Sequence, residues 1–351
     1  MTVLDLFAGP GGWSEGLRAL GLRDIGIETD SAACATRAAA GHATIRADVA
    51  AYPSTALLRK VSGLIASPPC QTFSAAGLRV GNVDRDLCHQ GLDDLARGRD
   101  TRATLRAACS DPRSLLVVEP LRYALDLRPD WIALEEVPAV APLFEHTAHL
   151  LAGIGYSTWT GVLNAADFGV AQTRRRVFLI ASRTRPALPP EPTHADGGTC
   201  ADLFGASLPP WLTMGDVLGC LPSEVITRGN HTTGGSRFPT TGPSWTLTGR
   251  ARSWLLKVGS RPTATRRRLD QPASTLLFGK AMNHVAWIDA DGTPIRRLTV
   301  EEAAILQGFP ARYPWAGSRT KQFEQIGNAV PAPLAAAVLR PLVPAALEVA
   351  A

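Results

Sequence analysis

Short apolar runs alternate with helix-like segments over residues 1–182. This βαβα alternation predicts an α/β fold, with a largely parallel sheet covered by helices. Helices are expected over Ser14–Leu20 and Ser31–Ala40, each followed by a glycine of the kind that ends a helix in the left-handed conformation. The expected strands are Val3–Phe7, Ile25–Glu28, Ala43–Arg46, Gly63–Ser67, Trp131–Glu135, Ser157–Leu163 and Val177–Ser182.

The pattern changes over residues 183–293, which are rich in Pro, Gly, Thr and Arg and show no long helical period. We expect a separate, smaller domain here that is built from loops and short strands. Two stretches in it, 242–247 and 271–276, resemble each other and suggest a paired hairpin unit, although the similarity is short. The helical pattern then returns, with a capping box at Thr299 and Glu302 and a last apolar helix that starts at Pro331.

The chain has 351 residues, of which 45% are apolar and 19% are charged. This length suits about two domains, and this composition excludes global disorder. No apolar run approaches the ~18 residues of a membrane span, and a strand-like run from Thr2 leaves no room for a signal peptide. The six cysteines lack metal-ligand spacing, so we expect reduced thiols and a cytosolic protein.

Positive charge is concentrated in one part of the chain. Ten Lys and Arg residues and a single acid, Asp270, lie between Ile226 and Met282, so this basic window carries +9 and the remainder carries −4. A basic segment on an otherwise nearly neutral chain is typical of a nucleic-acid contact. A solvated loop region rich in arginine is the alternative interpretation.

A glycine-rich turn follows the first expected strand, at residues 5–12 (DLFAGPGG). Glycine at positions 9 and 11 allows close approach of a ligand to the backbone. Glu28 ends the next strand, where a carboxylate can accept hydrogen bonds from ribose hydroxyls. The turn is not a P-loop, and Ser14 stands where the dinucleotide pattern needs its third glycine. A nucleoside without a pyrophosphate fits better, and a tight turn beside a solvated Glu28 is the alternative.

A cysteine follows the fourth expected strand, within residues 67–74 (SPPCQTFS). Cys70 thus stands at the carboxyl end of a strand, where ligands bind in open α/β sheets. The two prolines before it restrict the backbone, and a thiolate there would be nucleophilic. The alternative is a buried, unreactive cysteine, which is what we expect of Cys34, Cys109, Cys200 and Cys220.

Five ordered motifs together resemble the C5-cytosine-specific DNA methyltransferases, which use S-adenosylmethionine. The glycine turn resembles the first cofactor motif of this family. Residues 68–74 resemble its nucleophile loop, with Pro68 in place of a larger apolar residue. The remaining motifs are Glu135-Glu136-Val137, residues 172–176 (QTRRR) and residues 327–331 (GNAVP).

The resemblance implies a Rossmann-like class I methyltransferase sheet with helices on both faces. Residues 1–182 and 294–351 would form the catalytic, cofactor-binding domain, and residues 183–293 the target-recognition domain. No metal is implied, because the sulfonium of the donor already activates the methyl group. The implied cofactor contacts are Phe7 at the adenosine or sulfonium, Glu28 at the ribose, Asp48 at the adenine amino group, Asn328 and Val330 at the methionine part, and Gly9, Gly11 and Pro69 around them.

The resemblance also implies covalent catalysis by Cys70, whose thiolate would add to C6 of cytosine and activate C5 toward the methyl donor. Glu135 would share or donate a proton at N3, and Arg176 would stabilise charge at O2. Arg174 would hold the catalytic loop or a phosphate. The base that removes the C5 proton is not identified by the sequence, and water is one candidate.

Glu136 departs from the family, which usually has Asn at this position. An acid there adds negative charge beside a site that must stabilise negative charge. Three interpretations stay open: the side chain points away and pairs with an arginine, it is protonated, or activity is reduced.

Double-stranded DNA is the implied substrate, with the target cytosine flipped out of the duplex. Residues 71–99 would form a mobile loop that closes over the base, with Ser74 and Gln71 at the DNA. In the basic window, Lys and Arg would bind phosphates while a few residues read bases. The candidates are Thr246 or Thr275, each in a Thr-Leu element, and Arg250 and Arg252 for guanine.

Three alternatives remain. A related branch with the same motifs suggests tRNA as substrate, Glu136 suggests a catalytically weak DNA-binding homologue, and an exocyclic-amine methyltransferase is disfavoured by the cysteine at position 70. A separately acting restriction endonuclease would suit a prokaryotic or phage-encoded enzyme of the cytoplasm, which we expect to be a monomer.

Overall fold

The computed structural model describes residues 2–58, 60–73, 80–198, 207–219, 224–226, 237–239, 241–247, 255–257 and 298–343. The chain divides into two compact units. The first consists of Met1–Leu163, Arg175–Pro190 and Ala335–Ala351, and the second of Asn164–Arg174 and Glu191–Leu334.

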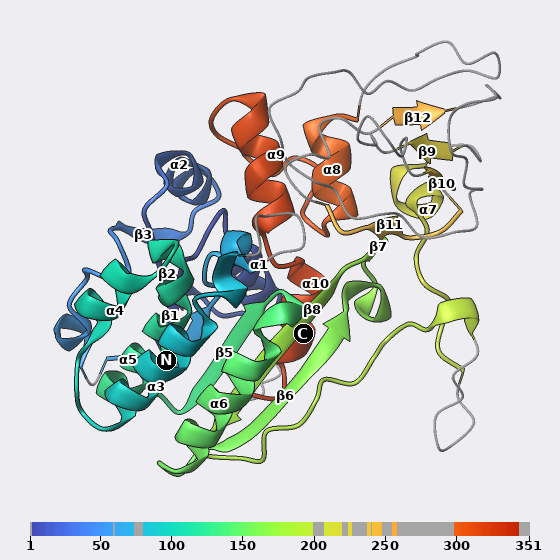
Figure 1. The fold of residues 1–351 in the computed structure, drawn as a ribbon. Coiled ribbons are helices and arrows are strands. Elements are labelled where there is room, and N and C mark those ends of the chain that lie inside the picture. Colours follow the sequence, from blue (N-terminus) through green and yellow to red (C-terminus); the bar gives the residue numbers. More distant parts are fainter. Residues whose placement is uncertain are drawn as a thin grey trace. The chain divides into compact units, whose positions relative to one another are not determined.

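A seven-stranded sheet forms the centre of the first unit, in the order β3-β2-β1-β4-β5-β8-β6 (Figure 1). The strands β1 to β5 pair in parallel, and β8 is antiparallel to β5. Each predicted strand of the first 182 residues is confirmed, with ends shifted by at most a residue or two. The bounds are β1 Val3–Leu6, β2 Asp24–Glu28, β3 Ala43–Arg46, β4 Gly63–Ala66, β5 Trp131–Glu136, β6 Ser157–Asn164 and β8 Arg175–Ser182.

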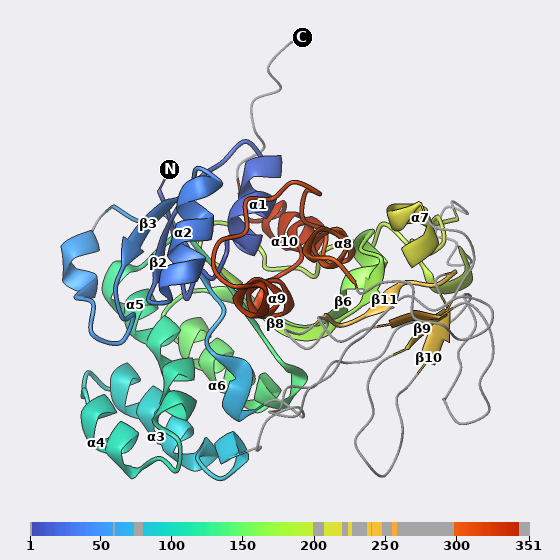
Figure 2. The same ribbon diagram turned by 90° about the horizontal axis from the view of Figure 1, so that it is seen from above.

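Helices cover both faces of this sheet, with α1 and α2 on one side and α3, α5 and α6 on the other (Figure 2). The central strands β1, β4 and β5 are buried along their whole length, as expected of parallel strands covered twice. The predicted helix-ending glycines, Gly21 and Gly41, have φ values of 73° and 78°. The helices are α1 Gly12–Ala19, α2 Ser31–Ala39, α3 Arg85–Ala96, α4 Arg102–Ala108, α5 Glu119–Leu127, α6 Ala141–Ala152 and α10 Ala332–Leu339.

Two predictions about this unit need correction. Residues 71–99 do not form one long loop, because α3 occupies most of the second half and buries Cys88 and Leu92, one helical turn apart. The last helix begins at Ala332, so Pro331 precedes it rather than forming its first residue.

The second unit contains short strands and three helices among its described residues. The strand β9 (Glu224–Ile226) pairs antiparallel with β10 (Arg237–Pro239) and β12 (Leu255–Lys257). β7 (Gln172–Thr173) pairs in parallel with β11 (Ser244–Trp245), so the stretch 242–247 adds to another segment instead of forming a hairpin unit. Its similar stretch 271–276 lies outside the described residues. The helices are α7 Met214–Leu218, α8 Val300–Leu306, which has the predicted capping box, and α9 Arg319–Asn328.

The two units do not have the bounds predicted for the catalytic and recognition domains. Residues 164–174 and 298–334 pack with the second unit. Hydrogen bonds between distant segments explain part of this packing. The side-chain amide of Gln172 donates to the Leu306 carbonyl and to the Gln307 side chain. The units describe packing, and the assignment of residues 183–293 to target recognition stays a prediction.

A buried polar network lies under the glycine turn. The Arg37 guanidinium of α2 is fully buried and donates to Asp24 (2.8 Å) and to the Ser14 hydroxyl (2.8 Å). It also approaches the Ala8 carbonyl of the turn, at 3.4 Å. It can lie there only because residue 26 is glycine, since a Cβ at that position would stand 2.4 Å from the Arg37 guanidinium.

Asp5, on β1, belongs to the same network but is poorly compensated. Arg37 is 3.8 Å away, and neither carboxylate oxygen has a hydrogen-bond partner among the residues that the structure describes. Burial, and then the negative charge of Asp24, raise the pKa of the Asp5 carboxyl well above its usual value, although Arg37 opposes them. A raised pKa means that the folded protein binds this proton more tightly than the unfolded chain does.

We expect Asp5→Asn to raise the free energy of unfolding at pH 7, because it replaces a poorly compensated buried carboxyl by a neutral amide. For the wild type this free energy should fall as pH rises from about 4 through the folded-state pKa of Asp5, because only the unfolded chain gives up the proton freely. The variant should lack that fall. Urea unfolding at pH 5 and pH 8 measures both effects.

Asp24→Asn is the matched control, because it removes the charge that holds Arg37 and should destabilise the fold at both pH values. Equal destabilisation by Asp5→Asn at pH 5 and pH 8 would contradict the protonated state of Asp5.

Candidate functional site

The carboxyl ends of five parallel strands bring most of the predicted site residues to one edge of the first unit. Leu6 at the end of β1 stands beside Ile27 of β2 and Ala66 of β4, and Ala66 stands beside Leu134 of β5. The segments that follow these ends therefore lie next to one another. The strand ends and the segments after them carry Phe7, Gly9, Gly11, Glu28, Asp48, Pro69, Cys70 and Glu135.

The glycine turn adopts a backbone that most side chains avoid. Gly9 and Gly11 have φ values of 53° and 107°, and Phe7 has 57°, which is uncommon for a residue with a side chain. A Cβ placed on Gly9 would have no atom within 4 Å, so its Cα faces open space. Strain of this kind is found where a binding site requires it.

Glu28 is oriented by three backbone N–H groups. Its Oε2 accepts from Gly9 at 2.8 Å, and its Oε1 accepts from Thr29 and Asp30 at 2.7 Å each. A carboxylate offers about four acceptor positions, so capacity for a further donor remains. Asp48, after β3, is exposed and accepts from the Ala50 backbone.

The segment that leads to Cys70 is held at its start. Ser67 follows β4, and its hydroxyl accepts a hydrogen bond from the Trp13 indole of α1 at 2.9 Å. Pro68 and Pro69 then restrict the chain up to Cys70, which begins a short 3-10 turn, Cys70–Thr72. The turn is followed by Phe73, which is buried in the main core.

Glu135 and Arg176 form an ion pair at the same edge. Glu135 is near the end of β5 and Arg176 near the start of the antiparallel β8, and the Arg176 Nε is 3.3 Å from the Glu135 Oε1. Both side chains are largely buried, with exposed fractions of 6% and 12%. The neighbouring Glu136 is also buried, and its Oε2 accepts from the Val137 backbone N–H at 2.5 Å.

The other half of the predicted Arg motif belongs to the second unit. Arg174 is buried and donates to the carbonyls of Gly327 (2.9 Å) and Leu247 (3.3 Å). Gln172 accepts from the Leu247 N–H at 2.6 Å. These contacts join three predicted motifs that are distant in sequence, namely 172–176, the Thr246-Leu247 element and 327–331.

The structure describes four more of the predicted site residues. Asn328 ends α9 with an exposed side chain, and Val330 is buried shortly after it. The Thr246 hydroxyl donates to the Thr173 carbonyl at 3.1 Å, and Gln71 is exposed. Ser74, Thr275, Arg250, Arg252 and most of the basic window lie outside the described residues, as do Cys200 and Cys220.

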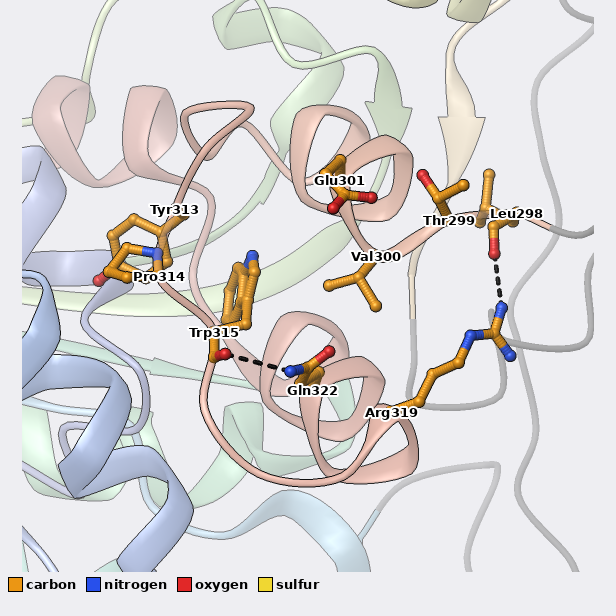
Figure 3. Close-up of a pocket in the computed structure, with 9 residues that line it drawn as sticks. All are labelled: Leu298, Thr299, Val300, Glu301, Tyr313, Pro314, Trp315, Arg319 and Gln322. Atoms are coloured by element: carbon orange, nitrogen blue, oxygen red, sulfur yellow. Dashed lines mark hydrogen bonds between the residues drawn. The ribbon is translucent and has the colours of Figure 1, made fainter.

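The second unit contains an open cavity of about 770 Å³ (Figure 3). Its walls are residues 298–301 from the start of α8, together with Tyr313, Trp315 and the face of α9 that carries Arg319. Arg319 donates to the Leu298 carbonyl at 2.7 Å. None of the sequence-predicted site residues lines this cavity.

Comparison with known proteins identifies the family. The sequence model described as "C-5 cytosine-specific DNA methylase" matches residues 1–88 and 101–343. The chain belongs to this family. Its reaction is therefore the methylation of cytosine C5 in DNA, and the family implies S-adenosylmethionine as the methyl donor.

Curated relatives agree with this assignment. The methylase is 30% identical to the type II methyltransferase M1.HphI of Haemophilus parahaemolyticus, over 96% of this chain and 85% of that protein. It is also 30% identical to the type II methyltransferase M.AplI of Arthrospira platensis, over 97% and 85%.

Solved structures share the fold, which confirms the predicted class I methyltransferase sheet. A DNA modification methyltransferase encoded within an E. coli prophage aligns with a TM-score of 0.58 at 19% identity, over 97% of this chain and 98% of that one. The S. pombe Dnmt2 methyltransferase aligns with a TM-score of 0.56 at 14% identity, over 97% and 99%. At these identities the likeness concerns the fold alone.

The described part of this methylase contains no group of three or more His, Cys, Asp or Glu side chains placed to hold a metal ion. In the same residues no helix has the length and apolar character needed to cross a membrane. Cys109 is buried, and burial raises the pKa of its thiol to about 11, which suits an unreactive role; Cys34 is half-buried.

Several residues that shape the candidate site are not predicted from the sequence. Arg37 and Trp13 act through side chains that reach other elements, and no local pattern marks such contacts. The sequence places Gln172 in a motif, but it does not predict the buried contacts that Gln172 makes at the end of α8. Gly26 could have been found from the sequence, because a glycine inside a strand indicates that another group approaches the backbone closely.

We expect Arg174→Ala to destabilise the methylase by about 2 kcal/mol or more, because it leaves the Leu247 and Gly327 carbonyls buried without a donor. Thermal unfolding measures this loss. Arg175→Ala is the matched control, since Arg175 is exposed in the same motif. Equal unfolding temperatures for the two variants would contradict a structural role for Arg174.

Proposed function

We propose that this chain methylates C5 of a flipped-out cytosine at a specific short sequence in duplex DNA, through a covalent bond between the Cys70 sulfur and cytosine C6. One observation carries the proposal most directly. The glycine turn, Glu28, the backbone of Cys70 and the Glu135–Arg176 pair meet at one edge of the parallel sheet. A cofactor and a base bound at that edge would be neighbours.

The residues at the edge fit S-adenosylmethionine. The open space at the Gly9 Cα admits a ligand against the backbone, and Glu28 is fixed with acceptor capacity for ribose hydroxyls. We assign Phe7 to the adenosine or sulfonium and Asp48 to the adenine amino group, with Gly11 and Pro69 around them. Asn328 and Val330 are assigned to the methionine part. When bound, the sulfonium supplies an electrophilic methyl group.

The chain's own residues prepare the base. The Cys70 thiolate forms a bond to C6, and the electrons of the C5–C6 double bond move toward C5 and the N3 side of the ring. Glu135 holds a proton at N3 of the base, and Arg176 stabilises charge at O2. The Arg176 Nε lies 3.3 Å from the Glu135 Oε1, so the two side chains can act on one ring. After methylation of C5, loss of the C5 proton to a base restores the double bond and expels the Cys70 thiolate.

Arg174 supports this machinery without touching the base. Its bonds to the carbonyls of Leu247 and Gly327 hold the Thr246-Leu247 element and the motif that carries Asn328. The basic window would supply phosphate contacts and the reading of bases, through Thr246 or Thr275 and through Arg250 and Arg252. The relatives named as type II methyltransferases support a partnership with a separate endonuclease.

Cys70→Ser should reduce methylation at least a thousandfold, because a neutral hydroxyl is a far poorer nucleophile than a thiolate. Wild-type protein should form a stable adduct with a duplex that contains 5-fluorocytosine, and the variant should form none. Denaturing gel electrophoresis detects the adduct, and bisulfite sequencing of host DNA shows the methylated site. Undiminished methylation by the variant would refute the mechanism, and methylation of tRNA but not duplex DNA would refute the substrate.

Glu136→Asn should retain activity, because the Asn carbonyl can still accept from the Val137 N–H and because Asn is the residue that the resembled family usually has here. Initial methylation rates of the variant and the wild type test this. A loss comparable to that of Cys70→Ser would show that the acid at position 136 is required.

A further inference from the structure

The 3-10 turn that carries Cys70 has a contact that its motif does not explain. The Arg113 Nη1, at the start of the segment Pro112–Val118, donates to the Gln71 side-chain oxygen at 2.5 Å. Gln71 is the residue after Cys70. Both residues belong to the first unit, although 42 positions separate them in sequence.

Arg113 is held in place for this contact. Its Nε lies 3.0 Å from the Asp111 Oδ1 and its Nη2 lies 2.6 Å from the Asp111 Oδ2, which is the bidentate geometry of a carboxylate–guanidinium pair. Asp111 also accepts from the Arg113 backbone N–H at 3.0 Å. The hydrogen bond with Arg113 lowers the pKa of the Asp111 carboxyl, so the pair is charged at neutral pH. The third arm of the guanidinium is thereby directed at Gln71.

Asp111 is itself tied to the fold through Asp84. The Asp84 carboxylate is buried and accepts from the backbone N–H groups of Ser110 (2.7 Å) and Asp111 (3.1 Å). Burial alone would raise the pKa of Asp84, but these amides and the Ser114 hydroxyl lower it overall. The result is a continuous series of contacts from the buried Asp84, through Asp111 and Arg113, to Gln71.

The turn Cys70–Thr72 needs support at the residues that follow Cys70. Before Cys70, the chain is fixed by two prolines and by the Trp13–Ser67 bond. After it, a three-residue 3-10 turn has little stability of its own. A displacement of about 1 Å at a reacting group can reduce a rate by two orders of magnitude.

We propose that Arg113 is a positioning residue, which orients the Cys70 turn by holding Gln71 and so sets the rate at which the sulfur attacks the base. The inference rests on the proposed function of Cys70. It assigns Arg113 no contact with the base or with the cofactor.

The test compares Arg113→Ala, Arg113→Lys, Gln71→Ala and the Arg113→Ala/Gln71→Ala double variant with wild-type protein. The rate of adduct formation on a 5-fluorocytosine duplex reports attack by Cys70. Steady-state kinetics separate kcat from the KM for DNA, and DNA affinity is measured at several salt concentrations. Arg97→Ala is the matched control, because Arg97 is an exposed arginine that pairs with Asp93 and lies on another element.

Arg113→Ala should slow adduct formation about tenfold and lower kcat to the same extent, with the KM for DNA unchanged. Gln71→Ala should slow adduct formation to the same extent, and the double variant should be no slower than either single one, because both act through one bond. Arg113→Lys, which keeps the charge and one donor, should recover part of the rate. Arg97→Ala should match the wild type.

Other results would overturn the proposal. Additive losses in the double variant would mean that the two residues act separately. A raised KM for DNA with a shallower salt dependence would make Arg113 a phosphate contact. Wild-type rates for Arg113→Ala, with an adduct formed by the wild type, would refute the positioning role alone. Absence of an adduct in the wild type would refute the function of Cys70, and the positioning role with it.

Discussion

Parallel pairing of the first five strands is the constraint on which the rest of the site depends. Parallel strands present their carboxyl ends at one edge, and the register of β1 with β2 and β4 aligns those ends closely. The glycine turn, Glu28 and the segment that carries Cys70 are far apart in sequence, yet each lies at the end of a strand or directly after one. The sheet therefore assembles the site, and local sequence needs only to supply the chemistry at each strand end.

The turn at the end of β1 shows how much buried polar structure such a site requires. The Glu28 carboxylate fixes the turn by accepting a hydrogen bond from the Gly9 N–H. The buried Arg37 guanidinium approaches the Ala8 carbonyl of the same turn. Burying an arginine and two carboxylates is costly unless each is compensated. Asp24 is compensated by Arg37 and Ser14, whereas Asp5 is not, and burial beside Asp24 raises the pKa of the Asp5 carboxyl as a result.

The second unit joins motifs in a different way. Gln172 and Arg174 use buried hydrogen bonds to backbone groups of Leu247, Leu306 and Gly327, so two side chains of one short segment order three others. Arg175, between them and Arg176, is exposed, and Arg176 turns to Glu135 in the first unit. Within this one motif, Arg174 therefore holds backbone groups of the second unit, whereas Arg176 pairs with a carboxylate of the first unit.

The amino-acid sequence by itself determined the α/β class, the position of each strand of the seven-stranded sheet, the helix ends at Gly21 and Gly41 and the family. These features arise from apolar periodicity, glycine conformation and short motifs, which are local properties. Only the tertiary structure decided that α3 replaces much of an expected loop, that Glu135 pairs with Arg176, that Arg174 supports backbone, and that Arg113 reaches Gln71. The physical reason is that a long polar side chain takes its partner from whatever the fold brings within a few ångströms, and no local pattern encodes that distance.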